Sequence, residues 1–289
     1  KKPIIFAFAL LMVGLGFKVA AVPFHIWVPD VYQGTSMPIT AFLSVGSKAA
    51  GFIVLLRVIE PFLNSSLTAS SVILILSFLV CVTLLFGNFV AIKQTNVKRL
   101  FAYSSIAHAG FLMMALPAME SDFHSKLIGP SSMESISFYL AGYLLMTMLC
   151  FLVLTIVSAA TNGESIDDLK GLGARSPLLA FAMLVGIASL AGIPLTVGFF
   201  GKFFLFNIAI QYAVFSGSWY VVSFAVLGAA AGFYYYFKII RVMYLGGSDQ
   251  DSDELTLEVN PLSKAVIIVL LTGVILCGVF PSLILGLLQ

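Results

Sequence analysis

Eight apolar stretches of about 20 residues or more follow one another along the chain, and they constrain the fold more than any other feature. An α-helix rises about 1.5 Å per residue, so about 20 apolar residues cross the ~30 Å hydrocarbon core of a bilayer. The pattern predicts an all-α, polytopic membrane protein with eight transmembrane helices in a single transmembrane domain, residues 1–289. The stretches cover residues 3–23, 38–59, 69–91, 99–118, 134–160, 177–209, 218–245 and 262–287.

The composition agrees with a membrane protein and excludes other classes. Hydrophobic residues make up 60% of the chain and charged residues only 10%, whereas soluble domains carry about 25% charged residues. The net charge of +2 gives no support for binding to nucleic acid. No motif for nicotinamide, flavin, haem or an iron–sulfur cluster is present, and the histidines and cysteines lack metal-ligand spacing. We therefore expect no cofactor and no metal in this chain.

Three lysines lie inside the apolar stretches: Lys18, Lys48 and Lys202. A charged side chain at the bilayer centre costs roughly 2.5–3.5 kcal/mol on the most lenient insertion scale, and such residues usually face a protein interior or a water-filled path. The alternative is that the long side chain snorkels to the interface. Snorkelling is easiest for Lys18 and hardest for Lys48, which lies in the middle of its stretch.

The 13 acidic residues all lie in connections or near the ends of the stretches. Because buried charges are normally paired, we expect each lysine to be neutral, hydrated or paired with a carboxylate from elsewhere. Burial lowers the pKa of a lysine, and a nearby acid raises it again. A lysine that alternates between these surroundings takes up and releases a proton near neutral pH, so the pattern predicts a role in proton transfer.

Glycine and proline interrupt two of the stretches. They are Gly14, Gly16 and Pro23 in the first, and Gly192, Pro194, Gly198 and Gly201 in the sixth, which is too long for one straight crossing. Each residue alone indicates only a packing or kink site. Interrupted membrane helices that also carry lysine, however, are typical of ion and substrate paths.

His108 lies in the middle of the fourth stretch and follows Tyr103, Ser104 and Ser105. A lone membrane histidine is often only a hydrogen-bond partner between helices. Here the neighbouring hydroxyl groups also provide polar surroundings for a proton path. His25, just after Pro23, is interpreted as interfacial. The candidate relay residues are Lys18, Lys48, His108 and Lys202.

The basic residues outside the stretches are distributed unequally between the two sides. Under the positive-inside rule, the odd-numbered connections are cytoplasmic and both ends of this chain lie outside. The odd connections carry Lys93, Lys98, Arg99, Lys170, Arg175, Lys238, Arg241 and Lys264, and the opposite side carries Lys1, Lys2, Arg57 and Lys126.

Five segments resemble the antiporter-like membrane subunits of respiratory complex I, most closely subunit N of bacterial NADH:quinone oxidoreductase. They are GLGFKVAAVPFHIWVPDVYQG at 14–34, SK at 47–48, QTNVKRL at 94–100 with YSSIAH at 103–108, SLAGIPLTVGFFGKF at 189–203, and GFYYY at 232–236.

The resemblance implies a fourteen-helix fold with two inverted five-helix repeats, in which helices seven and twelve are broken. The present chain then matches helices seven to fourteen. Residues 1–60 end a truncated first repeat, 69–245 form the second, and 262–287 form the C-terminal helix.

The resemblance also assigns roles to the candidate residues. Lys18, Lys48 and Lys202 match the lysines of helices seven, eight and twelve, and His108 matches a polar residue on the path between them. The glutamate of helix five, which pairs with the lysine of helix seven in the family, has no counterpart in this sequence.

By the same resemblance, the chain is a proton-translocating subunit that contacts K-type and M-type neighbours in a bacterial inner membrane. Redox chemistry belongs to partner subunits that hold NAD, FMN, iron–sulfur clusters and quinone. Two alternatives remain: a subunit of an Mrp-type cation/proton antiporter, and a structural spacer of the membrane arm. Lys202 favours complex I, since glutamate is expected there in the most similar Mrp subunit.

Overall fold

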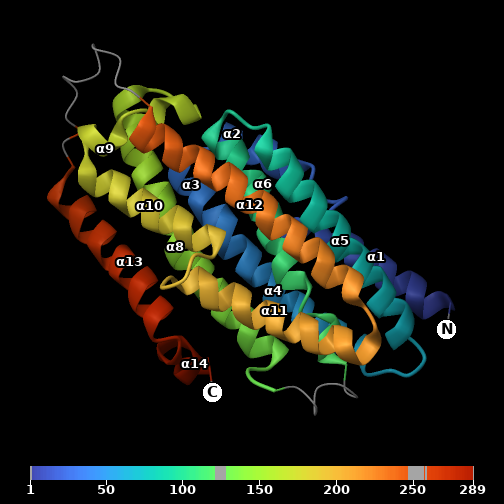
Figure 1. The fold of residues 1–289 in the computed structure, drawn as a ribbon. Helices are drawn as coiled ribbons and strands as arrows, with labels where there is room; N and C mark the ends of the chain where they lie inside the picture. The colour runs from blue at the N-terminus through green and yellow to red at the C-terminus, as the bar shows by residue number, and fades with distance from the viewer. Residues whose placement is uncertain (1, 121–127, 247–256, 258, 289) are drawn as a thin grey trace.

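The computed structural model describes residues 2–120, 128–246, 257 and 259–288, and within them every element of regular structure is a helix (Figure 1). A single isolated bridge joins Asn96 to Ser165. The helices are α1 (Lys2–Val19), α2 (Trp27–Gly34), α3 (Met37–Phe42), α4 (Lys48–Leu63), α5 (Ala69–Ile92), α6 (Val97–Met113), α8 (Ser132–Thr161), α9 (Leu172–Arg175), α10 (Pro177–Ala191), α11 (Val197–Ser216), α12 (Trp219–Leu245), α13 (Pro261–Val279) and α14 (Ser282–Leu288).

Eight helical segments in the described part of the chain are long and apolar enough to cross a membrane. The predicted all-α fold with eight candidate spans is therefore confirmed. The second span is a composite, because α3 continues through a π-helical turn, Leu43–Ser47, into α4. The predicted sixth stretch is divided into the short helix α10 and the spanning helix α11.

Polar residues begin several of the helices in the way that sequence rules describe. The Asn96 side chain accepts the backbone N–H of Arg99 at 3.1 Å and so caps α6. Ser131 and Glu134 form a reciprocal capping box at the start of α8, which satisfies two backbone donors that the helix leaves free. These caps fix where the two central helices start.

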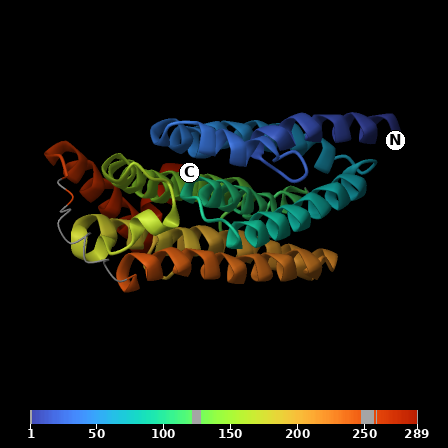
Figure 2. The ribbon, with the colours of Figure 1, turned by 90° about the horizontal axis from the view of Figure 1, so that it is seen from above.

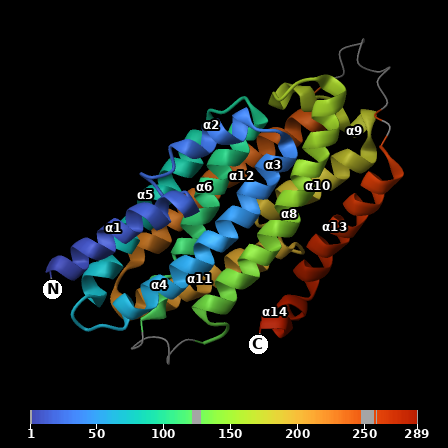
Figure 3. The ribbon, with the colours of Figure 1, turned by 180° about the vertical axis from the view of Figure 1, so that it is seen from behind.

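The helices pack in layers around α6. Seen from above, α1 to α4 lie along one face and α12 along the opposite face, with green helices of the middle of the chain between them (Figure 2). All residues of 104–118 are buried. The reverse view shows α1, α4, α8 and α13 side by side (Figure 3). Because α6 lies at the centre, its polar side chains face the protein and not the lipid.

The two interruptions differ in position from the sequence prediction. Helix α1 runs without a break through Gly14 and Gly16, and the chain leaves it only after Val19, before the short helix α2. Gly16 instead makes room for the ring of Phe24, because a Cβ there would lie 2.7 Å from it. Gly198 likewise lies inside α11, since the second interruption covers only residues 192–196.

Candidate functional site

Lys48 is the first residue after the π-helical turn and is 3% exposed. Its Nζ donates to both the carbonyl oxygen and the Oγ of Ser105 on α6. The Tyr32 hydroxyl lies 3.2 Å from the same Oγ, and the Tyr143 ring centroid lies 5.9 Å from the amine. The amine is therefore held by neutral oxygen atoms and an aromatic face.

Lys202 is 8% exposed and lies in the second turn of α11. Its Nζ donates to the carbonyl oxygens of Leu190 at 2.9 Å and Ala191 at 2.8 Å, which are the last two residues of α10. The Phe111 ring centroid lies 4.9 Å away. The C-terminal end of a helix carries partial negative charge on its free carbonyls, so the interruption itself supplies the lysine's partners.

The backbone geometry of the second interruption depends on two glycines. Gly192 ends α10 with φ +91°, a conformation that favours glycine. A Cβ at Gly198 would lie 1.8 Å from the carbonyl oxygen of Ser189. The Ser189 Oγ also accepts the Gly198 backbone N–H at 3.0 Å, which ties the start of α11 to the end of α10.

His108 lies between the two lysine sites and is 1% exposed. Its Nδ1 lies 2.5 Å from the Tyr139 hydroxyl on α8, and its Nε2 lies 3.0 Å from the Tyr236 hydroxyl on α12. Tyr236 also forms a hydrogen bond with Ser104 Oγ. Both ring nitrogens therefore have hydroxyl partners, each of which either donates or accepts.

Lys18 is not part of this interior cluster. Its side chain is exposed and has no hydrogen-bond or ion-pair partner among the residues that the structure describes. The stem passes Gly51 of α4, where a Cβ would lie 3.0 Å from the lysine Cγ. The structure thus brings together Lys48, His108 and Lys202 and leaves Lys18 on the outer face of α1.

His25 lies in the first interruption, between α1 and α2, and is buried within the protein at 7% exposure. Its ring packs edge-on against Phe86, with 4.5 Å between the ring centroids. Burial lowers the pKa of His25, and a hydrogen bond to the backbone of Pro23 acts in the opposite direction. This histidine has no bond to the interior cluster in the described residues.

Comparison with known proteins places this chain in a family. The family model described as NADH:quinone oxidoreductase/Mrp antiporter, transmembrane, matches residues 2–230. The chain belongs to this family.

Three solved structures show the extent of the similarity. A chain of respiratory complex I from Thermus thermophilus with bound aureothin is 33% identical, with a TM-score of 0.78, and the match covers 98% of this chain and 58% of that one. A chain of the membrane-bound sulfane sulfur reductase, an archaeal respiratory membrane complex, is 26% identical, with a TM-score of 0.82, and the match covers 95% of this chain and 52% of that one. A chain of the Mrp complex from Dietzia sp. DQ12-45-1b is 20% identical, with a TM-score of 0.79, and the match covers 99% of this chain and 58% of that one. That likeness shows the fold alone.

This antiporter-like chain therefore spans between 52% and 58% of the length of these three matching chains. It is an antiporter-like membrane subunit of the type found in complex I and in the related Mrp and sulfane sulfur reductase complexes. Among the described residues, no group of three or more His, Cys, Asp or Glu side chains comes together to hold a metal ion.

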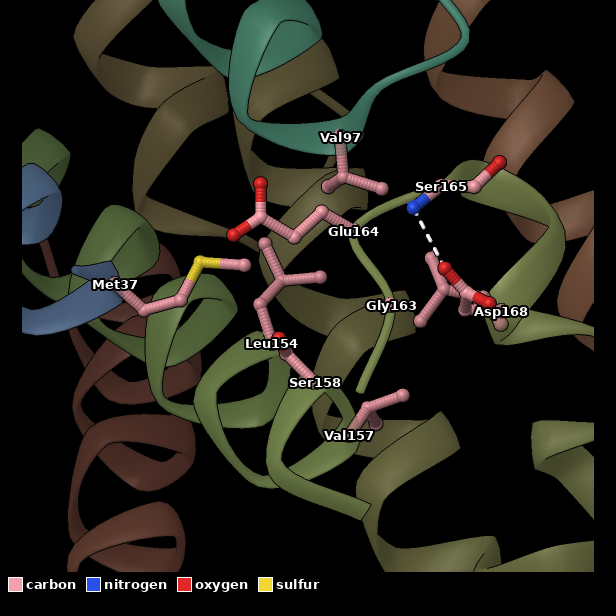
Figure 4. Close-up of a pocket in the computed structure, with 10 residues that line it drawn as sticks. Met37, Val97, Leu154, Val157, Ser158, Gly163, Glu164, Ser165 and Asp168 are labelled. Atoms are coloured by element: carbon pink, nitrogen blue, oxygen red, sulfur yellow. Dashed lines mark hydrogen bonds between the residues drawn. The ribbon is translucent and has the colours of Figure 1, made fainter. Parts of the chain in front are cut away.

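A second polar site lies at the basic end of this antiporter-like bundle. Lys98 is 4% exposed, pairs with Glu164 at 2.5 Å and donates to the carbonyl oxygen of Thr35 at 2.7 Å. Figure 4 shows Glu164 on the loop after α8, next to Val97, with the Ser165 N–H donating to Asp168 at 2.6 Å. Arg99, the next residue, pairs with Asp30 at 2.8 Å. Lys98 thus fastens this loop to the start of α6 and the end of α2.

Three tyrosines of the interior cluster were missed by the sequence analysis: Tyr32, Tyr139 and Tyr236. A tyrosine in an apolar stretch is equally typical of a packed core, so the residue type gives no distinctive signal. Signals existed for two of the three, since the segment at 14–34 holds Tyr32 and the segment GFYYY at 232–236 holds Tyr236. Tyr103, expected beside His108, is only half-buried and instead lines a pocket with His25 and Arg99.

Proposed function

We propose that this chain is a proton-translocating subunit of the membrane arm of an NADH:quinone oxidoreductase, and that it corresponds to subunit N of that complex. The observation that carries the proposal is the pair of buried lysines, Lys48 and Lys202, with His108 between them. The 33% identity with a complex I chain over 98% of this sequence supports the choice of complex.

The surroundings of the lysines suit reversible protonation. Within the described residues, both amines donate only to neutral oxygens, so loss of the proton leaves no carboxylate charge behind. Moving one charge against 100 mV requires about 2.3 kcal/mol, and one pKa unit is equivalent to about 1.4 kcal/mol. A change in lysine environment equivalent to about two pKa units is therefore sufficient for one transfer step.

The proposal includes a setting for the chain. Electron transfer takes place in partner subunits that hold NAD, FMN, iron–sulfur clusters and quinone, and K-type and M-type membrane subunits are the neighbours. The membrane is a bacterial inner membrane, and the end that carries Lys98, Lys170 and Arg241 faces the cytoplasm, as the positive-inside rule requires.

The test is Lys202→Met in the full-length protein within the intact complex, in inverted membrane vesicles. Lys264→Met, which alters an exposed lysine at the start of α13, is the matched control. We expect NADH-driven proton uptake to fall about tenfold or more in the first variant, as for loss of a proton-transfer group, and to be unchanged in the second. Full uptake with Lys202→Met would overturn the proposal.

Two other outcomes separate the alternatives. If deletion of the protein leaves NADH-driven proton uptake intact and cells lose only their tolerance of sodium, the chain is an Mrp-type antiporter subunit. If a variant without Lys18, Lys48 and Lys202 keeps every activity, the chain is a spacer.

A further inference from the structure

The His108 imidazole lies between two tyrosine hydroxyls that lead in opposite directions. Nδ1 is 2.5 Å from Tyr139 and Nε2 is 3.0 Å from Tyr236. The two tyrosines come from α8 and α12, and each is 1% exposed. A neutral imidazole has one donor and one acceptor nitrogen, and here each of them faces a hydroxyl group, so a proton can enter the ring at one nitrogen and leave it at the other.

Tyr236 leads toward the Lys48 site. Its hydroxyl forms a hydrogen bond with Ser104 Oγ. The next residue, Ser105, receives the Lys48 amine on its Oγ and its carbonyl oxygen. The two serines are consecutive on α6, so rotation about a serine side-chain bond is the one step in this direction that existing hydrogen bonds do not cover.

Tyr139 leads toward the Lys202 site. Its ring packs on Gly201, where a Cβ would lie 2.5 Å from the ring, and Lys202 is the next residue of α11. Phe111 connects the same two places, because its ring centroid is 4.9 Å from the Lys202 amine and 6.3 Å from the centroid of His108. Tyr139 therefore contacts His108 through its hydroxyl and the backbone next to Lys202 through its ring. No hydrogen bond in the described residues joins that hydroxyl to the Lys202 amine, so this direction also contains one step that existing hydrogen bonds do not cover.

We propose that Tyr236 and Tyr139 are the proton-carrying residues that connect His108 to Lys48 on one side and to Lys202 on the other. This inference rests on the proposed function and adds the route to it: Lys48, Ser105, Ser104, Tyr236, His108, Tyr139 and Lys202 in order. Tyrosine acts here through its hydroxyl, which gives and receives a proton in the same step.

The transfer balances at each atom. At the start, the proton of His108 is on Nδ1 and is donated to the Tyr139 oxygen, while the Tyr236 O–H donates to Nε2. A proton that reaches the Tyr236 oxygen from Ser104 lets that hydroxyl pass its own proton to Nε2. Nδ1 passes its proton to Tyr139, which releases its hydroxyl proton toward Lys202. One bond to hydrogen breaks for each one formed, and rotation of the hydroxyl groups and the ring restores the first state.

Tyr235 supplies a matched control in the same helix. It is also 1% exposed, and its ring centroid lies 4.5 Å from that of Tyr236. Its hydroxyl donates to Asn88 Oδ1 at 3.3 Å, and the Asn88 amide in turn donates to the carbonyl oxygen of Leu84. The same hydroxyl also forms hydrogen bonds with Tyr236 and Ser104. It forms none with His108, so Tyr235→Phe leaves both hydrogen bonds of the imidazole in place.

The experiment compares Tyr236→Phe, Tyr139→Phe and Tyr235→Phe in the full-length protein within its complex. We expect NADH-driven proton uptake to fall about tenfold in each of the first two variants, since a proton-transfer group is removed, and to stay within about twofold in Tyr235→Phe. Thermal unfolding of each variant serves as the check on folding. Equal uptake in all three variants and the unaltered protein would overturn the inference.

A spectroscopic readout separates this inference from the proposed function. In protein labelled with ¹⁵N at histidine, Tyr139→Phe removes the partner of Nδ1 and Tyr236→Phe removes the partner of Nε2. We therefore expect the two variants to shift different ring nitrogens of His108, and Tyr235→Phe to shift neither. Absence of these shifts would overturn the tyrosine connections even in a protein that pumps. Unaltered vesicles that take up no protons would instead overturn the proposed function.

Discussion

The two interruptions of the bundle each lie close to a lysine, but only one of them gives that lysine partners. At the second, the free carbonyls at the end of α10 accept the Lys202 amine. At the first, two of the last four carbonyls of α1 are occupied: Phe17 accepts the Trp27 indole at 3.0 Å, and Gly16 accepts the Ala21 N–H at 2.8 Å. In the described part of the chain, Lys18 donates to none of the carbonyls at the end of α1.

The difference follows from where each lysine stands relative to its interruption. Side chains on an α-helix tilt toward the helix N-terminus. Lys202 lies in the second turn of α11, so its stem points back to the interruption and reaches the end of α10. Lys18 lies in the last turn of α1, so its stem points away from the carbonyls of its own helix. To reach the carbonyls that an interruption exposes, the lysine therefore has to lie after the interruption in the sequence, as Lys202 does.

Among the variants that test this comparison, Gly198→Ala is expected to have the largest effect on the free energy of unfolding. The new Cβ would lie 1.8 Å from the Ser189 carbonyl oxygen, a backbone atom with little freedom to move. We expect the free energy of unfolding, from SDS titration of the purified protein, to fall by about 3 kcal/mol as α10 and α11 separate.

Gly14→Ala is the counterpart of that variant near the first interruption. Nothing lies within 4 Å of a Cβ there, and the residue is inside α1. A rise of about 0.5–1 kcal/mol is expected, because alanine favours the helix more than glycine does. Equal losses at both glycines would show that the two interruptions do not differ as described.

Gly192→Ala is expected to have the second largest effect. At φ +91° a side chain is strained by about 1–2 kcal/mol, and the Cβ would also lie 3.0 Å from Lys202 Cδ. Gly217→Ala, at φ +75° with open space around it, carries the strain without the crowding. The difference between the two variants in free energy of unfolding measures how closely Lys202 is held, and no difference would mean that the stem is loosely placed.

The smallest loss is expected from Trp27→Phe, which removes the indole donor from the carbonyl of Phe17. One hydrogen bond is equivalent to about 0.5–1.5 kcal/mol of stability. The variant leaves the Ala20 N–H, at 3.3 Å, as the donor to the Phe17 carbonyl. If the indole had kept Lys18 from this oxygen, the reactivity of Lys18 toward an amine-specific reagent is expected to decrease. Unchanged reactivity would show that the direction of the Lys18 stem, and not the competition for carbonyls, decides the contrast.

The sequence predicted the features that depend on local composition. The apolar stretches placed the spans, and the cost of burying charge singled out Lys18, Lys48 and Lys202, of which the structure buries Lys48 and Lys202 and leaves Lys18 exposed. It did not predict their partners, because Ser105 and Leu190 come from helices distant in sequence from the lysine or across the interruption. The three expected states of each lysine, neutral, hydrated or paired with a carboxylate, did not include the backbone carbonyl as an acceptor. Gly14 and Gly16 were assigned to an interruption because only packing, which is tertiary, distinguishes a helical glycine from a hinge.

The π-helical turn Leu43–Ser47 sets the direction in which the Lys48 side chain points. Such a turn contains one residue more than an α-helical turn, and one residue corresponds to about 100° of rotation about the axis. Without that residue, Lys48 would be turned away from Ser105 by about a quarter of a revolution, while the span would remain apolar and long enough to cross the membrane. The turn therefore determines the orientation of α4 about its own axis. A chain one residue shorter at this point would form the same helix, but the Lys48 amine would point in another direction.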